Sequence, residues 1–134
     1  MHPLRLARAF FALLCCAVLQ VAAHGPFNLV VLDDLLTHTV QPLHVVSALS
    51  GLVGPGGLVL IASDNDWTAT ATPRNSWLGG FKMNGDDMPT LAMLRHNLKR
   101  HFNFLDAVDV PKVTQTHQRK FEVSILETSA WVRL

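Results

Sequence analysis

Charged residues are scarce in this sequence. Only 16% of its 134 residues are Asp, Glu, Lys or Arg, while 49% are hydrophobic, so the chain is poorer in charge and richer in apolar side chains than a typical globular domain. The formal net charge is +1, which gives no electrostatic reason to expect a nucleic-acid partner. The length fits one small domain, and the apolar content is sufficient for a core.

Cysteine is almost absent. The two thiols, Cys15 and Cys16, are adjacent, and neighbouring cysteines rarely bridge because disulfide geometry requires well-separated Cα atoms. The chain therefore has neither a disulfide framework nor a CxxC pair, and we expect a reducing, cytoplasmic environment. Both thiols lie in an apolar run, where a thiol stays protonated and is a poor nucleophile.

Several common catalytic motifs are missing too. The sequence contains no HExxH pattern, no GxSxG nucleophile elbow and no GxxxxGK[ST] phosphate loop. The seven histidines are scattered rather than spaced as metal ligands, so we predict no metal site. The glycine-rich residues 54–57 precede a strand-like run rather than a helix, and they indicate a turn. Residue counts alone do not exclude a Ser/His/Asp triad.

Long hydrophobic runs are absent except at the N-terminus. Arg5 and Arg8 precede an apolar run from Ala9 to Ala23 that ends in small residues, which is the form of a secretory signal peptide. The run is shorter than the about 20 apolar residues of a membrane-spanning helix. Two interpretations stand: a leader cleaved on secretion, or an apolar helix packed on the sheet. We therefore separate residues 1–26 from a domain at 27–134.

The first part of the domain has the pattern of a βαβ unit. Phe27–Leu32 and Leu58–Ser63 are nearly continuous apolar runs, which are typical of parallel strands buried on both faces. Residues 43–52 carry leucine and valine at helical spacing between them. Strand, helix, glycine-rich turn and strand predict two parallel strands with a right-handed crossover.

The remainder of the chain predicts a loop, a helix and a hairpin. Residues 64–88 read as a long irregular segment that holds two tryptophans, and loops of this length are usually functional or disordered. A helix with leucines on one face follows, with Thr90 as its candidate cap. Phe102–Val110 and Lys120–Leu134 alternate apolar and polar residues and predict an antiparallel pair at the sheet edge, joined by a polar connection at 111–118.

Polar residues at the ends of the predicted strands are the first candidate site. Asp33 and Asp34 follow the first strand, and Asp64 and its neighbours follow the second. Ligands of open α/β sheets bind outside the carboxyl ends of the strands. The same residue types also form caps and turns, so each of them has both a functional and a structural interpretation.

The tryptophan-containing loop is the second candidate site. Aromatic rings offer a face to a flat heterocycle or a cation, an arginine offers a planar fork to a carboxylate, and paired glycines permit close backbone approach. The alternative is that the aromatic side chains only anchor the loop to the domain. The candidate residues of this loop are Trp67, Arg74, Trp77, Gly79, Gly80, Phe81 and Lys82.

The motifs together resemble a known family. "GPGGLVLI" looks like the fifth-strand signature of class I S-adenosylmethionine-dependent methyltransferases. "TPRNSWLGGF", "DVP" and "RKF" before a terminal tryptophan resemble the methyltransferase domain at the C-terminus of ovothiol synthases, the 4-mercaptohistidine N1-methyltransferases. The resemblance covers residues 27–134. It implies an α/β fold of partial Rossmann-like type, with strands four to seven and intervening helices, behind an apolar N-terminal helix.

The resemblance also implies a reaction and a set of site residues. S-adenosylmethionine would be the cofactor, and its methyl group would pass to the imidazole nitrogen of a thiolated histidine. Asp33 and Asp34 would lie at the cofactor, and the loop would cover the substrate. From the planar fork of the guanidinium, and not from the family, we infer that Arg74 or Arg119 meets the substrate carboxylate. The family resemblance identifies no catalytic residue in this chain.

One departure from the family is large. Class I methyltransferases carry a glycine-rich loop after their first strand and an acid after their second, and nothing before Phe27 matches either. The chain therefore resembles the second half of a truncated domain, which would leave Phe27–Leu32 as an exposed apolar edge. The alternatives are a catalytically inactive fragment, a subunit completed by a partner chain that supplies the missing half-domain, or a small secreted protein. Enzymatic activity stays open.

Overall fold

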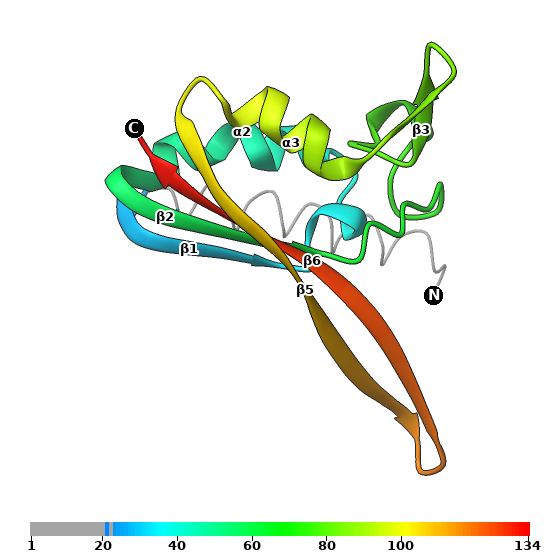
Figure 1. Cartoon of the computed structure of the whole chain (residues 1–134). Coiled ribbons are helices and arrows are strands. Elements are labelled where there is room, and N and C mark those ends of the chain that lie inside the picture. The colour runs from blue at the N-terminus through cyan, green and yellow to red at the C-terminus, as the bar shows by residue number, and fades with distance from the viewer. Residues whose placement is uncertain (1–20, 22) are drawn as a thin grey trace, which may run out of the picture.

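The computed structural model describes residues 21 and 23–134. The predictions for the leader, as a cleaved signal or a packed apolar helix, and for Cys15 and Cys16 lie largely outside these residues. The described chain forms a four-stranded mixed sheet with two α-helices on one face, together with a small two-stranded sheet (Figure 1). Among the described residues, none of the helices has the length and apolar character needed to cross a membrane.

The predicted βαβ unit is present. Strand β1 (Phe27–Asp33) and strand β2 (Val53–Ser63) are parallel, and helix α2 (Pro42–Leu52) connects them after the short 3-10 helix η1 (Leu36–His38). Pro42 begins α2, a position where its missing N–H costs nothing.

The glycine-rich segment differs from its prediction. Because Val53 pairs with Phe27, β2 begins before residues 54–57, and the predicted turn is instead an irregular stretch inside the strand. The register shifts within this stretch, and Gly56 adopts a φ of 79° there, a conformation that glycine reaches without steric cost.

The C-terminal hairpin is longer than predicted. Helix α3 (Thr90–Leu98) is followed by β5 (Phe102–His117) and β6 (Lys120–Arg133), which pair along almost their whole lengths. The predicted polar connection at 111–118 is therefore mostly strand. Pro111 is tolerated because β5 is an edge strand, where no ladder partner needs its N–H.

The two strands of this hairpin lie together at one end of the main sheet, as predicted. The sheet order is β1-β2-β6-β5, so β6 lies between two neighbours, and β1 and β5 are the two outer strands. β6 is antiparallel to both β2 and β5, while the other three strands run in one direction. The hairpin is confirmed, but its second strand is an internal one.

A second hairpin lies within the segment predicted to be irregular. Strands β3 (Phe81–Met83) and β4 (Asp86–Met88) pair around Asn84 and Gly85, whose φ angles are 53° and 86°. Asn-Gly is the usual signal for such a two-residue turn. The rest of the segment holds only the 3-10 helix η2 (Arg74–Ser76).

The core fills the space between the two helices and one face of the sheet. Its centre includes Trp131 of β6, Val59 and Ile61 of β2, and Leu49 of α2, all of them fully buried. The prediction that β1 is buried on both faces is wrong, because Leu29 and Val31 are each 53% exposed. These alternate residues lie on the face away from the core, and neither described α-helix covers that face.

The outer parts of β5 and β6 project beyond the rest of the sheet (Figure 1). The β2–β6 pairing ends where Ser63 meets Glu127. Beyond that point, residues 110–117 and 120–126 pair only with each other. We call these two segments the arm. The arm extends from the edge where β1 and β2 end.

Candidate functional site

The carboxyl ends of β1 and β2 form the first candidate site. The two strands end together, because Asp33 is paired with Ala62. Asp34 and Asn65 follow them with φ angles of 53° and 58°. Left-handed backbone is uncommon outside glycine, is most accessible to Asp and Asn, and clusters at functional sites. Two such residues on neighbouring strand ends therefore mark this edge of the sheet.

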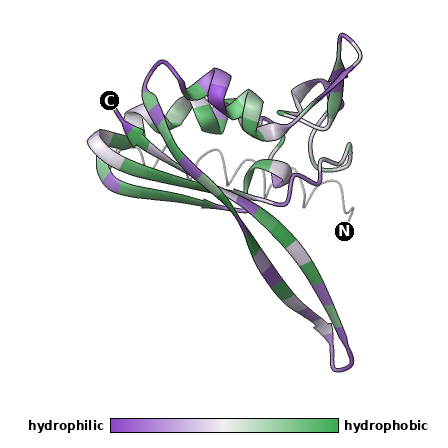
Figure 2. Cartoon of the chain, in the orientation of Figure 1, coloured by the Kyte–Doolittle hydropathy of each residue, from purple (hydrophilic) through white to green (hydrophobic). Residues whose placement is uncertain are grey.

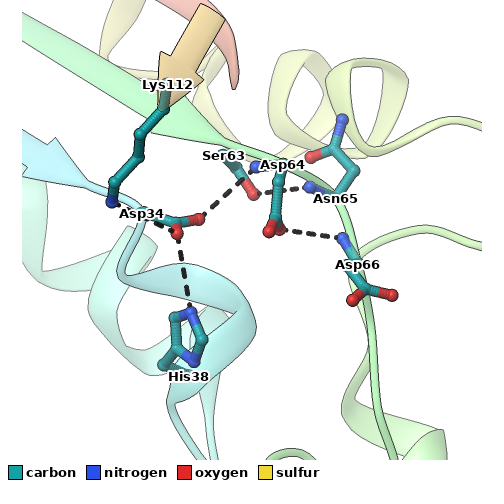
Figure 3. Close-up of polar contacts among 7 residues, drawn as sticks. All are labelled: Asp34, His38, Ser63, Asp64, Asn65, Asp66 and Lys112. Atoms are coloured by element: carbon teal, nitrogen blue, oxygen red, sulfur yellow. Dashed lines mark hydrogen bonds and ion pairs between the residues drawn. The ribbon is translucent and has the colours of Figure 1, made fainter. Parts of the chain in front are cut away.

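Asp34 contacts three other residues at this edge: His38, Asp64 and Lys112 (Figure 3). Its Oδ2 lies 3.6 Å from Nε2 of His38 and 3.9 Å from Nζ of Lys112 on β5. Its Oδ1 accepts a hydrogen bond of 3.4 Å from the backbone N–H of Asp64. The carboxylate side chain is only 15% exposed, while the side chains of His38 and Lys112 are both exposed to solvent. Such pairs contribute little to stability, so their main effect is to position the carboxylate.

The turn after β2 is held by short-range hydrogen bonds. The N–H of Asn65 donates to Oγ of Ser63 at 3.1 Å, and the N–H of Asp66 donates to Oδ1 of Asp64 at 3.0 Å (Figure 3). The Asn65 amide donates through Nδ2 to Oε1 of Glu127 on β6 at 3.3 Å. Its Oδ1 is buried and accepts no hydrogen bond from the described residues. This edge thus presents the carboxylates of the residues that follow β1 and β2, and the unused amide acceptor of Asn65 is buried beneath it.

The edge has no metal-ligand cluster. Within residues 21 and 23–134, no three His, Cys, Asp or Glu side chains gather closely enough to hold an ion. Asp34 and His38 face one another, and Lys112 also pairs with Asp34. The arrangement suits hydrogen bonding to a polar ligand.

A groove of about 920 Å³ forms the second candidate site. The first turns of α2, the loop around η2, and α3 enclose it. The guanidinium of Arg74 lies 5.6 Å from the ring centroid of Trp77, and Nε1 of Trp77 donates to the backbone oxygen of Thr72 at 2.9 Å. The wall is therefore a fixed aromatic ring with a cation beside it. The groove is lined by Gln41, Leu43, His44, Ser47, Ala48, Arg74, Asn75, Ser76, Trp77, Leu78, Phe81, Met93 and Asn97.

The structure divides the residues predicted for the loop. Arg74, Trp77 and Phe81 all line the groove. Trp67 does not: it is 7% exposed, belongs to the core, and donates from Nε1 to Oγ1 of Thr90 at 3.0 Å. Lys82 lies outside the groove, with its Nζ 3.7 Å from Oδ1 of Asp87.

Thr90 does not have its predicted role as a cap. It is the first residue of α3 with Pro89 at the cap position, and no side chain forms a capping hydrogen bond there. Its hydroxyl instead accepts the indole N–H of Trp67. A buried indole N–H needs an acceptor, and this need explains why a threonine occupies the first turn.

The paired glycines allow close packing within the loop. A Cβ on Gly79 would lie 2.7 Å from the backbone nitrogen of Thr90 and 2.8 Å from its Cα. Gly80 has a φ of 72°, and its N–H donates to the backbone oxygen of Met88 at 3.1 Å. These glycines thus let the loop backbone pack closely against α3 and β4, and their predicted part in substrate binding stays a prediction.

Two predicted site residues lie apart from the groove. Asp33 ends β1 with an exposed side chain at the carboxyl edge. Arg119 lies in the turn between β5 and β6, at the tip of the arm and remote from the η2 loop (Figure 1). Of the two arginines predicted as partners of a substrate carboxylate, only Arg74 therefore lines the groove.

The sequence interpretation missed three residues of the carboxyl edge. His38 stands four residues after Asp34, a spacing that brings side chains together on one helical turn, so this pair had a local signal. Lys112 and Glu127 had none, because they reach the edge only through the pairing of β5 and β6 beside β2.

Comparison with known proteins gives evidence on the fold alone. No protein-family model matches the chain, and no curated protein matches it. One similar solved structure comes from work on the conversion of a disulfide bond into a thioacetal group during echinomycin biosynthesis, with 14% sequence identity and a TM-score of 0.52. The alignment covers 80% of this chain and 48% of that one. This chain thus has an α/β fold that spans about half the length of that structure.

Proposed function

We propose that this chain is a methyltransferase-type α/β domain that contributes strands four to seven of a partial Rossmann-like fold. The observation that carries the proposal is the sheet order β1-β2-β6-β5, in which only β6 is antiparallel. The order of a strand with terminal acids, a helix, a second strand, a loop, a helix and two antiparallel strands is the order in which the sequence resembles the second half of class I methyltransferases. The "GPGGLVLI" segment lies in β2, the strand that the resemblance numbers as the fifth.

The proposed reaction is N-methylation of a thiolated histidine, as in ovothiol biosynthesis. The acceptor would be an imidazole nitrogen, and a proton would leave the ring as the nitrogen gains the methyl group. When bound, S-adenosylmethionine supplies the electrophilic methyl group. Such a transfer depends chiefly on alignment of the nitrogen and the methyl carbon, so the task of this chain is to hold the acceptor.

The described residues fit one part of S-adenosylmethionine and not the whole molecule. Asp33 and Asp34 at the carboxyl edge offer acceptors for hydroxyl or ammonium groups. Within residues 21 and 23–134, however, no glycine-rich turn leads from a strand into a helix, which is the element that receives an anionic cofactor end. We therefore derive no step through the cofactor from these residues.

The groove supports a flat, anionic acceptor. The ring of Trp77 offers a stacking face to an imidazole, and Arg74 beside it offers a guanidinium to a carboxylate. Phe81 closes another part of the wall. A thiol-imidazole amino acid has both of these features, which makes this groove the proposed substrate site.

Isothermal titration with S-adenosylmethionine tests the cofactor part of the proposal. We expect a single saturable site, weakened about tenfold in a variant with Asp33→Asn and Asp34→Asn, because a neutral amide is a weaker acceptor for hydroxyl and ammonium groups. A variant with Asp86→Asn and Asp87→Asn on β4 removes the same charge away from the edge and should bind normally. If the unmodified chain gives no binding heat and no thermal shift with S-adenosylmethionine, the proposal is contradicted.

A separate titration with 4-mercaptohistidine tests the groove. We expect Arg74→Ala and Trp77→Ala each to weaken binding about tenfold, since they remove the carboxylate partner and the stacking face. Lys82→Ala, a nearby cation outside the groove, is the matched control and should have no effect. The alternative interpretation as an inactive domain predicts no binding in either titration.

A further inference from the structure

The face of the main sheet that lies away from α2 and α3 is apolar across three strands. On β1, Leu29 and Val31 are each 53% exposed, and Leu58, the partner of Leu29 on β2, is 40% exposed. Figure 2 shows the apolar character of β1 and β2. Parallel strands are normally covered on both faces, so this surface needs a cover. We call it the outer face; by strand alternation its apolar residues are Leu29, Val31, Leu58, Leu60, Ala130 and Val132.

Asp33 places a negative charge at one end of the outer face. It alternates with Leu29 and Val31 along β1, so its exposed side chain lies on the same face as theirs. Its neighbour Asp34 already pairs with two cations, whereas no cation among the described residues pairs with Asp33. The outer face is therefore apolar along β1 and acidic at the carboxyl edge.

The chain enters β1 from a helical residue through a short turn. Val21 has helical backbone, and the N–H of His24 donates to its carbonyl oxygen at 3.1 Å. Residues 22–26 alone separate Val21 from Phe27, the first residue of β1. A connection this short places a helix beside the strand that it leads into and antiparallel to it. Because α2 and α3 lie on the other face, the outer face is the one left for such a helix.

The segment that precedes Val21 has the composition and the length to cover the outer face. Residues 9–20 are apolar except for one glutamine, and they are rich in alanine and leucine, which are strong helix formers. A helix from Arg8 to Val21 is about 20 Å long, and β1 has about the same length. Arg8, with Arg5 one turn before it, thus reaches the level of Asp33.

We propose that residues 9–20 cover the outer face as a helix antiparallel to β1, with Arg5 and Arg8 beside Asp33. The apolar side chains of this segment then pack on Leu29 and Val31 and remove them from water. The positive end of the helix dipole lies at the acidic end of the face, where it is favourable. The charges and the apolar surfaces of the two partners therefore match in the same orientation.

The attachment of this segment favours it over a second copy of the chain as the cover. A segment joined to β1 through residues 22–26 is held near the outer face at an effective concentration of about 1 mM or more. A second copy would have to compete with it from dilute solution. Cleavage of a secretory leader would instead leave the outer face open, which makes the two interpretations of the N-terminus distinguishable by experiment.

Thiol labelling of the full chain tests the proposal, because its two cysteines, Cys15 and Cys16, lie in the middle of the segment. We expect at least one of these thiols to react with a neutral maleimide about tenfold or more slowly than in a Val31→Asp variant, since a carboxylate on the outer face disfavours apolar docking. Val123→Asp is the matched control: Val123 is 66% exposed on the opposite face of β6, and its substitution should leave labelling unchanged.

A variant of the segment itself keeps the test valid if Val31→Asp does not fold. Phe10→Asp combined with Phe11→Asp changes no residue of the sheet, and it should accelerate labelling as Val31→Asp does. Circular dichroism of each variant shows whether the fold is retained.

A charge-reversal series tests the orientation of the segment. Asp33→Lys should accelerate labelling about two- to fivefold, because it places a cation beside Arg5 and Arg8. Adding Arg5→Glu and Arg8→Glu to this variant should restore most of the protection. Asp86→Lys is the control, since Asp86 is exposed on β4 and lies outside the main sheet.

Four results would overturn the proposal. They are loss of the segment from the chain in cells, measured by mass spectrometry; equal labelling rates in the unmodified chain and the two apolar-to-Asp variants; protection that grows with chain concentration, which would identify a second copy as the cover; and charge variants whose combination labels faster than Asp33→Lys alone. None of these measurements involves a cofactor or an acceptor, so failure here is distinguishable from failure of the proposed methyltransferase function.

Discussion

Single residues of the tryptophan-containing loop have structural roles that determine which side chains reach the groove. Trp67 and Trp77 are only ten positions apart in one loop, yet Trp67 is buried in the core while Trp77 lines the groove. The difference arises because Thr90 accepts the indole hydrogen bond of Trp67. Gly79 makes that arrangement possible, since the loop backbone lies directly against Thr90.

Gly79→Ala is expected to destabilise the protein by about 1–3 kcal/mol, because its Cβ would overlap backbone atoms of Thr90 that cannot move independently. Urea unfolding measures this change in the free energy of unfolding. Gly51→Ala is the matched control: Gly51 lies in α2 with no atom within 4 Å of an added Cβ. It should stabilise the fold by about 0.5–1 kcal/mol. Equal effects of the two substitutions would contradict the packing argument.

Among the elements, the β3–β4 hairpin connects the loop with the groove. Its first residue, Phe81, lines the groove, and its last residue, Met88, accepts the N–H of Gly80. The turn at Asn84 and Gly85 requires two consecutive left-handed residues. This small element therefore depends on its turn chemistry more than on burial, since both of its strands are largely exposed.

Gly85→Ala should loosen this hairpin without unfolding the domain, because alanine at a φ of 86° is strained by about 1 kcal/mol or more. Amide hydrogen exchange is the measurement. We expect roughly fivefold faster exchange in β3 and β4, and unchanged exchange in β2 and β6. Asn84→Gly keeps left-handed backbone accessible and serves as the control. Faster exchange throughout the sheet would show that the hairpin is coupled to the core.

For the whole molecule, the insertion of β6 between β2 and β5 is the decisive feature. It places Trp131 at the centre of the core, where the ring meets Phe104 edge-on at a centroid distance of 5.1 Å. Nε1 of Trp131 donates to Oγ of Ser129 at 2.9 Å, so the buried indole has its acceptor on the same strand. Trp131 therefore joins β6 to the core and to Phe104 of the neighbouring β5.

Trp131→Ala should cost about 3–5 kcal/mol, which is a large fraction of the stability of a small domain. Thermal unfolding followed by circular dichroism should show a much lower Tm, or no cooperative transition. Val113→Ala on the arm removes an exposed apolar side chain instead, and it should leave Tm of the monomer nearly unchanged. A loss below about 1 kcal/mol for Trp131→Ala would contradict the central position of this residue.

Apolar runs and side-chain spacing were sufficient to predict most strands and helices, but not which other elements pack against them. Apolar runs predicted β1, β2 and their parallel pairing, and leucine spacing predicted α2 and α3. The same runs wrongly predicted β1 to be buried on both faces, because apolar composition cannot show which elements cover a strand. Asn84-Gly85 was a usable turn signal that the prediction of an irregular segment overlooked.

Only those residues of the candidate sites that have a local sequence signal were predictable. Asp34 and the groove residues Arg74, Trp77 and Phe81 were identifiable from their positions after strands and within a decorated loop. Lys112 was not, because its contact with Asp34 joins residues 78 positions apart in the chain.

What the sequence determined by itself was local: strand and helix positions, which follow from side-chain periodicity, and turn chemistry, which follows from glycine and asparagine. The tertiary structure alone decided the order of strands in the sheet, the burial of Trp67 rather than Trp77, and the separation of Arg119 from the groove. These features depend on pairings between distant segments. Backbone hydrogen bonds in a sheet are the same for every residue type, so a sequence specifies strands more readily than their neighbours.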